Sequence, residues 1–368
     1  MKASVILLAA GGTGGHLFPA EALANILVAR GYRVHLATDA RGIAYGGNFP
    51  AEARHLIHAG TPTKRDPVRN LVALARLALG LAQSFWLIIK LRPAVVVGFG
   101  GYPSVPPLVA AYLLRRPLYL HEQNGVMGRA NRFLARLARG IGTGFAAPKL
   151  TPPAIMSRLR HVGNPVRPKV RDVAEIAYDA PTSDGELRIL ITGGSQGARI
   201  LSDVVPQALA LLSDTMRKRL LITHQARADD IENARTRYAK AGVKAEIAAF
   251  FTDLPERIAA SHLVIGRAGA STIAELSVIG RPSILIPLAG SLDQDQAANA
   301  ESLRAIGAAQ VMAQRDFRPE TLAAVLTSFL QDPRHLTDAA KAAKQAAIPD
   351  AAQRFADFVL EAASAIRH

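Results

Sequence analysis

A glycine-rich stretch near the start of the chain has the residue types of an anion-binding loop. Residues 9–16 read AAGGTGGH; they follow the apolar run SVILL and precede a segment with helical periodicity. Glycines let the backbone approach a ligand closely, and the free N–H groups at a helix start carry partial positive charge. The stretch therefore indicates a loop that receives a phosphate or diphosphate group.

The spacing matches neither of the two best-known phosphate-binding loops. A dinucleotide-binding G-x-G-x-x-G that starts at Gly12 requires glycine where the chain has Leu17, and a P-loop requires Gly-Lys followed by Ser or Thr, which this stretch lacks. Asp39 ends the second apparent strand, YRVHLATD, at a place where an acid can bind a ribose. A nicotinamide-dependent oxidoreductase therefore stays an alternative.

A second stretch repeats the pattern of the first. Residues 187–198 read LRILITGGSQGA, again an apolar run, two glycines, a hydroxyl residue and a further glycine, at an offset of 182 residues. This repeat indicates a duplicated architecture, which a single nicotinamide site does not explain.

The elements that must position these loops alternate between strand-length apolar runs and helical patterns. The runs are AVVVGFG, RPLYLHE and RGIGTGF in the first half and RLLITH, HLVIGRAG, RPSILIPL and AAQVMA in the second. The alternation predicts two doubly wound α/β domains with parallel sheets, whose ligands bind at the carboxyl ends of the strands. Further polar or glycine-rich stretches follow strands at this edge, namely GFGGYPS, HEQN, RAGASTIAE and LAGSLDQDQAANA.

The segment HVGNPVRP breaks local structure and indicates a domain boundary. We expect one domain over residues 1–166 and a second over residues 167–349. Residues 350–368 have a helical pattern, and we expect this helix to complete the first domain.

The charge of the chain is unevenly distributed. Residues 1–166 contain 20 lysines and arginines against 5 acidic residues, whereas residues 167–368 contain 24 of each, so the net charge of +15 lies in the first domain. A basic half indicates an anionic partner such as nucleic acid, acidic lipid or a phosphorylated substrate. An aromatic content of 5% argues against the stacking surfaces of a nucleic-acid-binding protein.

Composition also limits the chemistry and the compartment. The 368 residues, of which 49% are hydrophobic, suffice for two domain cores. The absence of cysteine excludes disulfides, thiolate metal sites and thiol catalysis. The first residues begin a strand almost at once, without the pattern of a signal peptide, so we expect a cytoplasmic protein.

A long apolar segment of the first domain reads NLVALARLALGLAQSFWLIIKLRP. Its longest stretch without charge, Leu77 to Ile89, is shorter than the roughly 20 apolar residues that span a bilayer. Phe85 and Trp86, with lysines and arginines around them, suit an interfacial helix on anionic lipid, and a buried core helix is the alternative. The basic charge of the domain favours peripheral attachment to a membrane.

Seven motifs, in chain order, resemble those of the MurG-type N-acetylglucosaminyltransferases of peptidoglycan synthesis: AAGGTGGH, GFGGY, HEQN, VGNPVR, GGSQGA, RAGASTIAEL and DQAANA. The resemblance implies the GT-B fold, in which two Rossmann-like domains face a central cleft. It also implies inverting transfer of N-acetylglucosamine from UDP-N-acetylglucosamine (UDP-GlcNAc) to lipid I, undecaprenyl-pyrophosphoryl-MurNAc-pentapeptide, which gives lipid II. The partners implied are UDP-GlcNAc, lipid I, the anionic lipid surface on the cytoplasmic side of the inner membrane and a cell-wall synthesis complex, with no nucleic acid.

The resemblance assigns donor binding to residues of both domains, which are Thr13, Gly14, Gly15, Asn124, Arg167, Ser195, Phe251, Ala270, Ser271, Thr272, Ile273, Ala274, Glu275, Gln296 and Asn299. Ser195 and the amides around it are similar to the family's diphosphate cradle, and Arg167 would add positive charge. Glu275 resembles the family's ribose-binding acid, since one carboxylate can accept hydrogen bonds from two hydroxyls.

The remaining donor contacts also follow from the resemblance. Gln296 and Asn299 are similar to the amide pair that reads the sugar hydroxyls. Phe251 lies where the family uses main-chain groups to read uracil. Asp295 departs from the family pattern, which leaves the sugar contact at that position open.

His16 and Glu122 are the two candidate bases for deprotonating the acceptor hydroxyl, and both stay open. Asp293-Gln294-Asp295 has the D-x-D pattern with which another glycosyltransferase class holds a divalent cation on UDP. The glycine loop, Arg167 and the helix dipoles already offer charge stabilisation for the leaving UDP. We therefore expect no catalytic metal and no cofactor.

Overall fold

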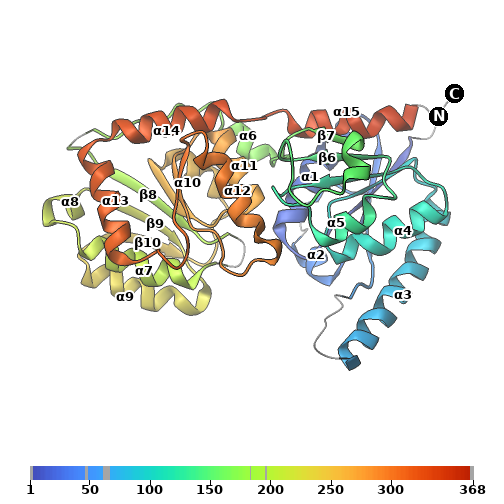
Figure 1. Ribbon diagram of the computed structural model, residues 1–368, viewed down its shortest axis with the longest axis horizontal. Helices are drawn as coiled ribbons and strands as arrows, with labels where there is room; N and C mark the ends of the chain where they lie inside the picture. Colours follow the sequence, from blue (N-terminus) through green and yellow to red (C-terminus); the bar gives the residue numbers. More distant parts are fainter. Residues whose placement is uncertain (1–2, 46–48, 61–66, 183, 195–196, 365–368) are drawn as a thin grey trace. The chain divides into compact units, whose positions relative to one another are not determined.

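The computed structural model describes residues 3–45, 49–60, 67–182, 184–194 and 197–364. The chain divides into two compact units (Figure 1). Unit 1 comprises Met1–Arg167 and Pro349–His368, and unit 2 comprises Pro168–Ile348. The chain therefore leaves unit 1 after Arg167 and returns to it at Pro349.

Within its described residues, unit 1 is built on a seven-stranded parallel sheet with the strand order β3-β2-β1-β4-β5-β6-β7. The strands are β1 (Val5–Ala9), β2 (Arg33–Thr38), β3 (Ala53–Leu56), β4 (Val95–Gly98), β5 (Leu118–Glu122), β6 (Gly140–Thr143) and β7 (Leu159–His161). The helices are α1 (Gly14–Ala29), α2 (Ala40–Tyr45), α3 (Pro67–Leu91), α4 (Val105–Leu113), α5 (Arg129–Leu134) and α15 (Ala351–Ser364), with 3-10 turns at Tyr102–Ser104 and Pro153–Arg158.

Each face of this sheet has its own core, because successive side chains of a strand point to opposite faces. Ile6 and Leu8 of β1 pack with α1 and α15, whereas Leu7 and Ala9 pack with α3 and α4. Helix α15 lies against β6, where glycines make the space for its aromatic rings. A Cβ atom on Gly140 would lie 2.4 Å from Cζ of Phe358. The C-terminal helix is thus an integral part of unit 1.

Unit 2 is built, within its described residues, on a six-stranded parallel sheet with the order β10-β9-β8-β11-β12-β13. The strands are β8 (Leu187–Thr192), β9 (Leu220–Gln225), β10 (Lys244–Ala248), β11 (Leu263–Gly266), β12 (Ser283–Leu285) and β13 (Ala309–Val311). The helices are α6 (Pro168–Asp172), α7 (Arg199–Ala210), α8 (Asp214–Lys218), α9 (Ile231–Lys240), α10 (Leu254–Ala260), α11 (Ala270–Ile279), α12 (Asp295–Arg304), α13 (Pro319–Gln331) and α14 (Arg334–Gln345), with 3-10 turns at Ala228–Asp230 and Leu292–Gln294.

Both sheets reverse their strand order at a comparable place. In unit 1 the reversal lies between β1 and β4, and in unit 2 it lies between β8 and β11. Open parallel sheets bind ligands beyond the carboxyl ends of the strands at such a reversal. The prediction of two doubly wound domains is confirmed, and the two glycine-rich stretches follow β1 and β8, one at each reversal.

Candidate active site

The first glycine-rich loop is held by Asp39, which follows β2. The backbone N–H of Gly12 donates to Oδ1 of Asp39 at 3.1 Å, and the N–H of Gly42 donates to the same oxygen at 2.8 Å. Gly12 has a φ of +82°, a conformation that favours glycine. Asp39 therefore fixes the loop after β1, and this use of its carboxylate does not support the ribose contact that the nicotinamide alternative requires.

His16 lies at the carboxyl edge of the sheet, in the first turn of α1. Its imidazole is half-buried against the loop after β4. A Cβ atom on Gly101 would lie 3.3 Å from Cδ2 of the ring, and one on Gly100 would lie 3.5 Å from Cε1. The glycines of the GFGGY motif therefore make room for this imidazole at the reversal between β1 and β4.

Glu122, the last residue of β5, has a different environment. Only 1% of its surface is exposed, and its carboxylate accepts hydrogen bonds from the N–H of Asn124 at 2.9 Å, the N–H of Gly128 at 2.9 Å and Nδ2 of Asn131 at 2.8 Å. Burial raises the pKa of Glu122, and these hydrogen bonds oppose that effect. The side chain closes the loop over residues 123–128 from inside the unit.

The two candidate bases, His16 and Glu122, are linked through Gly100 and Asn131. A Cβ atom on Gly100, against which His16 packs, would lie 3.3 Å from Nδ2 of Asn131, the same nitrogen that binds Glu122. Asn124 is half-buried, and its Nδ2 lies 3.4 Å from Oε1 of Glu122. The structure thus brings His16, Asn124 and Glu122 into one neighbourhood, with Glu122 enclosed and the other two nearer to solvent.

Arg167 lies on unit 1, beside the start of α1. Its guanidinium stacks over the ring of Phe18, 4.1 Å from the centroid. Burial raises the pKa of Glu21, one turn further along α1, and Arg167 lowers it. Phe18 turns back over Gly14, where a Cβ atom would lie 2.9 Å from the ring. Among the sequence-predicted residues of this turn, Gly14 is buried, Thr13 is half-buried and Gly15 is exposed.

The second glycine-rich loop joins β8 to α7, and Ser195 lies outside its described residues. Gly194 and Gly197 have φ values of +73° and +65°. A Cβ atom on Gly193 would lie 2.3 Å from the backbone nitrogen of Ala198, so only glycine fits there. The diphosphate role of Ser195 therefore stays a prediction, on a loop whose described glycines have the expected tight geometry.

The loop after β11 leads into α11, which carries most of the predicted donor residues. Helix α11 begins at Ala270, and its N-cap residue Gly269 makes no side-chain capping bond within the part of the chain that the structure describes. The Ser271 hydroxyl in its first turn is buried and makes no hydrogen bond with any residue that the structure describes. Glu275 follows one turn later on the same side of the helix and is buried. The Ser271 hydroxyl and the N–H groups of this first turn suit an anionic ligand, whereas the Glu275 carboxylate suits a partner that donates hydrogen bonds, such as a hydroxyl group.

The other predicted residues of α11 have ordinary surroundings. Ala270 and Ile273 are buried, and Thr272 and Ala274 are half-buried. Any contact of these four residues with a ligand would therefore be made mainly by the backbone of the first turn.

The predicted amide pair on α12 is engaged by the protein. Oε1 of Gln296 accepts from the N–H of Leu288 at 3.0 Å, and Nδ2 of the fully buried Asn299 donates to the carbonyl of Ala268 at 3.1 Å. These bonds join α12 to the loop after β12 and to the loop after β11, respectively. The amides therefore shape the edge, and their contact with a sugar stays a prediction.

The D-x-D triplet has a distinctive backbone. Asp293 and Gln294 have φ values of +63° and +54°, and Oδ1 of Asp295 accepts from the N–H of Gln296 at 2.9 Å. Among the residues that the structure describes, no group of three or more His, Cys, Asp or Glu side chains is arranged to hold a metal ion.

Two groups of residues lie at the loops after β8, β9 and β10; one contains the predicted Phe251, and sequence reasoning missed the other. Phe251 was predicted; it is buried, with the Arg257 guanidinium 4.1 Å from its centroid. The unpredicted residues are Thr192, Gln225, Arg227 and Asp230. The signal that marks Gln225, Arg227 and Asp230 is their position, since the polar stretch QARADD directly follows the strand pattern RLLITH.

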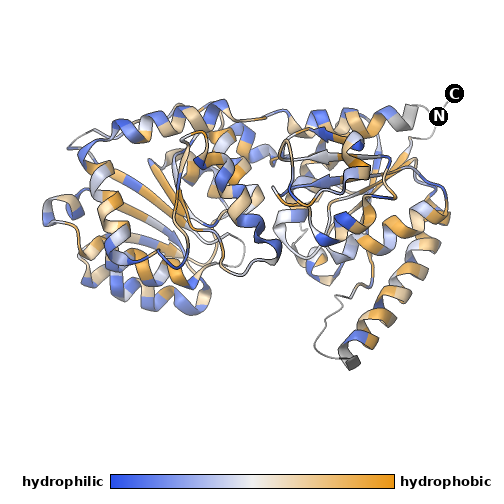
Figure 2. Cartoon of the chain, viewed as in Figure 1, coloured by the Kyte–Doolittle hydropathy of each residue, from blue (hydrophilic) through white to orange (hydrophobic). Residues whose placement is uncertain are grey.

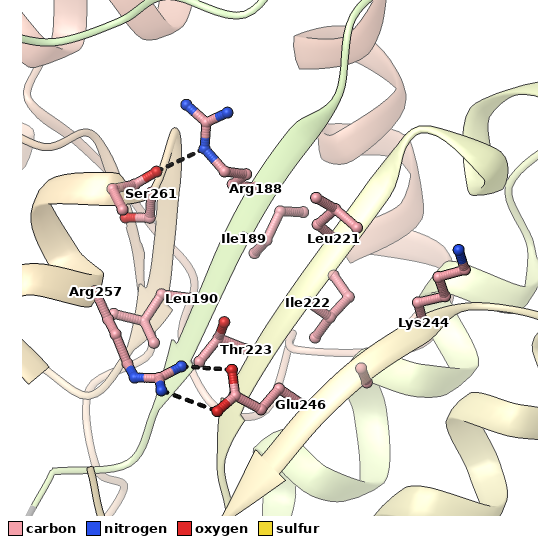
Figure 3. Close-up of a pocket in the computed structure, with 12 residues that line it drawn as sticks. Arg188, Ile189, Leu190, Leu221, Ile222, Thr223, Lys244, Glu246, Arg257 and Ser261 are labelled. Carbon is pink, nitrogen blue, oxygen red and sulfur yellow. Dashed lines mark hydrogen bonds and ion pairs between the residues drawn. The ribbon is translucent and has the colours of Figure 1, made fainter. Parts of the chain in front are cut away.

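Unit 2 also has a pocket of about 460 Å³ that lies apart from these loops (Figure 3). It opens over the starting and middle residues of β8, β9 and β10, beside α10. Arg257 pairs there with Glu246 at 2.6 Å, and Nε of Arg188 donates to the Ala260 carbonyl at 2.7 Å. None of the sequence-predicted site residues lines this pocket.

Helix α3 is the long apolar segment of unit 1, and it extends away from the sheet (Figure 1). Within Asn70–Leu91 its most apolar 18 residues have a mean hydropathy of 1.8, and 28% of that part is buried. By length and composition it could cross a membrane, so the expectation that the segment is too short is wrong: a single charge, Arg76, had divided the apolar run. The low buried share also distinguishes α3 from a core helix.

The aromatic pair of α3 is divided between two environments. Phe85 packs against the core of unit 1, whereas Trp86 is 63% exposed with Nζ of Lys90 4.7 Å from its ring centroid. Figure 2 shows that most of α3 is hydrophobic. Its exposed large apolar residues are Leu71, Val72, Leu74, Leu79, Trp86 and Ile89.

The comparisons with known proteins agree with the seven motifs. The chain matches the Glycosyltransferase family 28 N-terminal domain over residues 6–143 and the Glycosyltransferase family 28 C-terminal domain over residues 188–355. The UDP-N-acetylglucosamine--N-acetylmuramyl-(pentapeptide) pyrophosphoryl-undecaprenol N-acetylglucosamine transferase of Methylobacterium nodulans is 55% identical, over 98% of this chain and 97% of its own length. The protein of the same name from Methylobacterium sp. (strain 4-46) is 54% identical over the same shares.

A solved structure gives the same result. The crystal structure of MurG from Acinetobacter baumannii has a TM-score of 0.78 and 30% sequence identity, covering 97% of this chain and 99% of that chain. The resemblance stated from the motifs is therefore confirmed. With close relatives over nearly its whole length and the family 28 domains in both halves, the chain belongs to the MurG family of glycosyltransferases.

Proposed function

We propose that this enzyme transfers N-acetylglucosamine from UDP-GlcNAc to lipid I, forming lipid II with inversion at the anomeric carbon. The observation that carries the proposal is the pair of glycine-rich loops, one at the strand-order reversal of each unit. Two such loops suit a reaction in which both substrates carry a diphosphate. The names of the relatives at 54% and 55% identity support this choice of substrates.

The donor binds to unit 2 in this proposal. The free N–H groups at the start of α11 and the buried Ser271 hydroxyl take the diphosphate together with the loop after β8. Glu275, one turn along α11, binds the ribose hydroxyls. Helix dipoles and fixed backbone N–H groups stabilise the charge that develops on UDP as it leaves.

The acceptor binds to unit 1, and His16 is the general base. The neutral imidazole takes the proton of the acceptor hydroxyl as its oxygen forms the new bond to the anomeric carbon, while the electron pair of the breaking bond leaves with UDP. Glu122 is less suited to this role, because its carboxylate is almost fully enclosed and already accepts hydrogen bonds from three neighbouring groups. Glu122 instead positions the loop that carries Asn124.

The enzyme attaches to the membrane from the cytoplasmic side through unit 1 in this proposal. The exposed apolar surface of α3 suits insertion among lipid headgroups, and the excess of positive charge in residues 1–166 suits an anionic surface. A lipid-linked acceptor would then reach the unit that binds it without leaving the bilayer. An association with other enzymes of cell-wall synthesis is compatible with this location.

Titration of the purified chain with UDP-GlcNAc, NADH and duplex DNA tests the donor assignment. We expect UDP-GlcNAc to bind and the other two not to bind at moderate salt. Glu275→Ala should weaken UDP-GlcNAc binding with the melting temperature unchanged. Binding of NADH in preference to UDP-GlcNAc, or no transfer of N-acetylglucosamine to a soluble lipid I analogue, would overturn the proposal.

A further inference from the structure

Two arginines flank one buried carboxylate, Asp230, which follows β9: Arg227 lies in the same loop, and Arg199 is the first residue of α7. Asp230 is 4% exposed, and its Oδ1 accepts a hydrogen bond from Nε of Arg199 at 3.0 Å. Nε of Arg227 lies 4.0 Å from the other oxygen, Oδ2. That oxygen is buried and makes no hydrogen bond with the residues that the structure describes. Burying a carboxylate costs free energy unless cations or hydrogen-bond donors compensate its charge. The two arginines are the groups that compensate the charge of Asp230.

The second glycine-rich loop is packed on Arg227. Gly197 has a φ of +65°, and a Cβ atom there would lie 2.6 Å from Cγ of Arg227 and 3.2 Å from its backbone nitrogen. Glycine is thus required at position 197 both by its conformation and by the stem of this arginine. The side chain of Arg227 is therefore in contact with the loop after β8, although it belongs to the loop after β9.

The guanidinium groups of Arg199 and Arg227 differ in their bonds with acidic residues. The hydrogen bond with Asp230 raises the pKa of Arg199, and Asp203 and Asp229 add to this effect. Arg227 has a single ion pair, longer than a hydrogen bond, and its guanidinium donates no hydrogen bond within the described residues. Its side chain is 47% exposed. Arg227 is therefore the cation with donors available for a ligand.

The sheet topology places this arginine between two parts of the proposed donor site. Strand β9 lies between β10 and β8, so the loop after β9 lies between the loop that contains Phe251 and the second glycine-rich loop. In the proposed function, the loop that contains Phe251 binds the uracil and the second glycine-rich loop binds the diphosphate. A nucleoside diphosphate that reaches from one of these loops to the other passes the loop after β9, and the planar fork of an arginine suits two phosphate oxygens.

We propose that Arg227 binds the diphosphate of the nucleotide donor and that Asp230 is a positioning residue that holds the Arg227 guanidinium beside Gly197. This inference rests on the proposed function, because it takes UDP as the ligand of unit 2. Asp230 acts only through the arginine and touches no substrate.

Calorimetric titration of the full chain with UDP, and with uridine as a probe without phosphates, tests the inference. Arg227→Met should weaken UDP binding about tenfold, equal to roughly 1.4 kcal/mol, with uridine binding changed less than about twofold. Arg227→Lys should restore part of the loss. Asp230→Asn should weaken UDP binding in the same direction, and the double variant should bind no more weakly than Arg227→Met, because the two residues act as one unit.

Arg237→Met is the matched control, since Arg237 makes a comparable ion pair with Asp203 at 2.8 Å between α7 and α9. It should leave UDP binding unchanged. Arg227→Met that binds UDP within about twofold of the wild type would overturn the inference, as would an equal loss of uridine binding. Failure of the wild-type chain to bind UDP would overturn the proposed function instead, so the two failures are distinguishable.

Discussion

The hydroxyl of Thr192 donates a hydrogen bond to Oε1 of Gln225 at 3.0 Å. The same hydroxyl accepts from the N–H of Gly194 at 3.2 Å, and Nε2 of Gln225 lies 3.4 Å from the carbonyl of Ala249. These bonds run from the loop after β8, across the end of β9, to the loop after β10. A single buried amide thus fixes the relative positions of the loops to which the diphosphate and the uracil are assigned.

Gln225→Leu removes this connection without changing the size of the side chain greatly. We expect the free energy of unfolding to fall by about 1–3 kcal/mol, because two hydrogen bonds are lost and one of the partners, the Thr192 hydroxyl, stays buried. UDP binding should weaken several-fold, as the loops lose their common support. Urea unfolding and calorimetry measure the two effects. Gln207→Leu, on the exposed side of α7, is the control, and UDP affinity equal to wild type in Gln225→Leu would show that the loops are independent.

His16→Asn separates the two candidate bases. We expect kcat to fall by about 100-fold or more, the usual range for a general base, with UDP-GlcNAc affinity unchanged within about twofold. Glu122→Gln should instead lower the melting temperature, because an amide NH₂ would point at groups that themselves donate. The reverse pattern, an active His16→Asn and an inactive but stable Glu122→Gln, would assign the base to Glu122.

Transfer should persist in excess EDTA, within about twofold of the rate with magnesium. The physical reason is that α11 and the second glycine-rich loop offer N–H groups to the departing diphosphate, while the Asp295 carboxylate accepts from its own helix. The measurement is the initial rate of transfer after chelation and dialysis. Complete loss of activity that only magnesium or manganese restores would make Asp293 and Asp295 ligands of a catalytic ion.

Stability should fall in mild acid because of buried neutral histidines. In unit 2, burial lowers the pKa of His224 to about 4, from about 6.5 in an unfolded chain. Between these values the unfolded chain binds a proton that the folded chain does not, so the free energy of unfolding falls as the pH drops through this window. Between pH 7 and pH 5 the wild type should lose about 2 kcal/mol more than His224→Leu.

The control for this prediction is His335→Leu, since His335 is an exposed residue of α14. Its pH dependence should match that of the wild type. In unit 1 the buried His121, whose pKa burial also lowers to about 4, acts in the same sense as His224. Its neighbour Glu122 acts in the opposite sense, because a raised carboxyl pKa favours the folded state at low pH. A His224→Leu variant with unchanged pH dependence would contradict the argument.

The sequence predicts the central strands because parallel strands covered on both faces are continuous apolar runs. β1 (VILLA) and β11 (LVIG) are buried throughout and were expected. The strands β3 (ARHL), β7 (LRH) and β10 (KAEIA) were not expected, and each lies at an edge of its sheet. Edge strands are partly exposed and carry charged residues, which removes the hydrophobic signal.

Site residues could be predicted from the sequence only where they form a local sequence pattern. The glycine-rich loops and the start of α11 are local patterns, and the family resemblance added roles to them. The bonds Thr192–Gln225 and Gly12–Asp39 join residues 33 and 27 positions apart, which no local pattern reveals. Glu122 stays a candidate base from the sequence, and only the fold shows that its carboxylate also accepts the hydrogen bonds that hold a loop.

Trp86→Ser should weaken binding to vesicles that contain anionic lipid at least about fivefold, roughly 1 kcal/mol, without lowering the melting temperature, because Trp86 is exposed on α3. Phe85→Ser should lower the melting temperature, since its ring packs in the core of unit 1. Transfer to a soluble acceptor should survive Trp86→Ser. Phe250→Ser removes an exposed aromatic residue from unit 2 and should leave vesicle binding unchanged. Equal vesicle binding by Trp86→Ser and the wild type would mean that the membrane contact lies elsewhere than on α3.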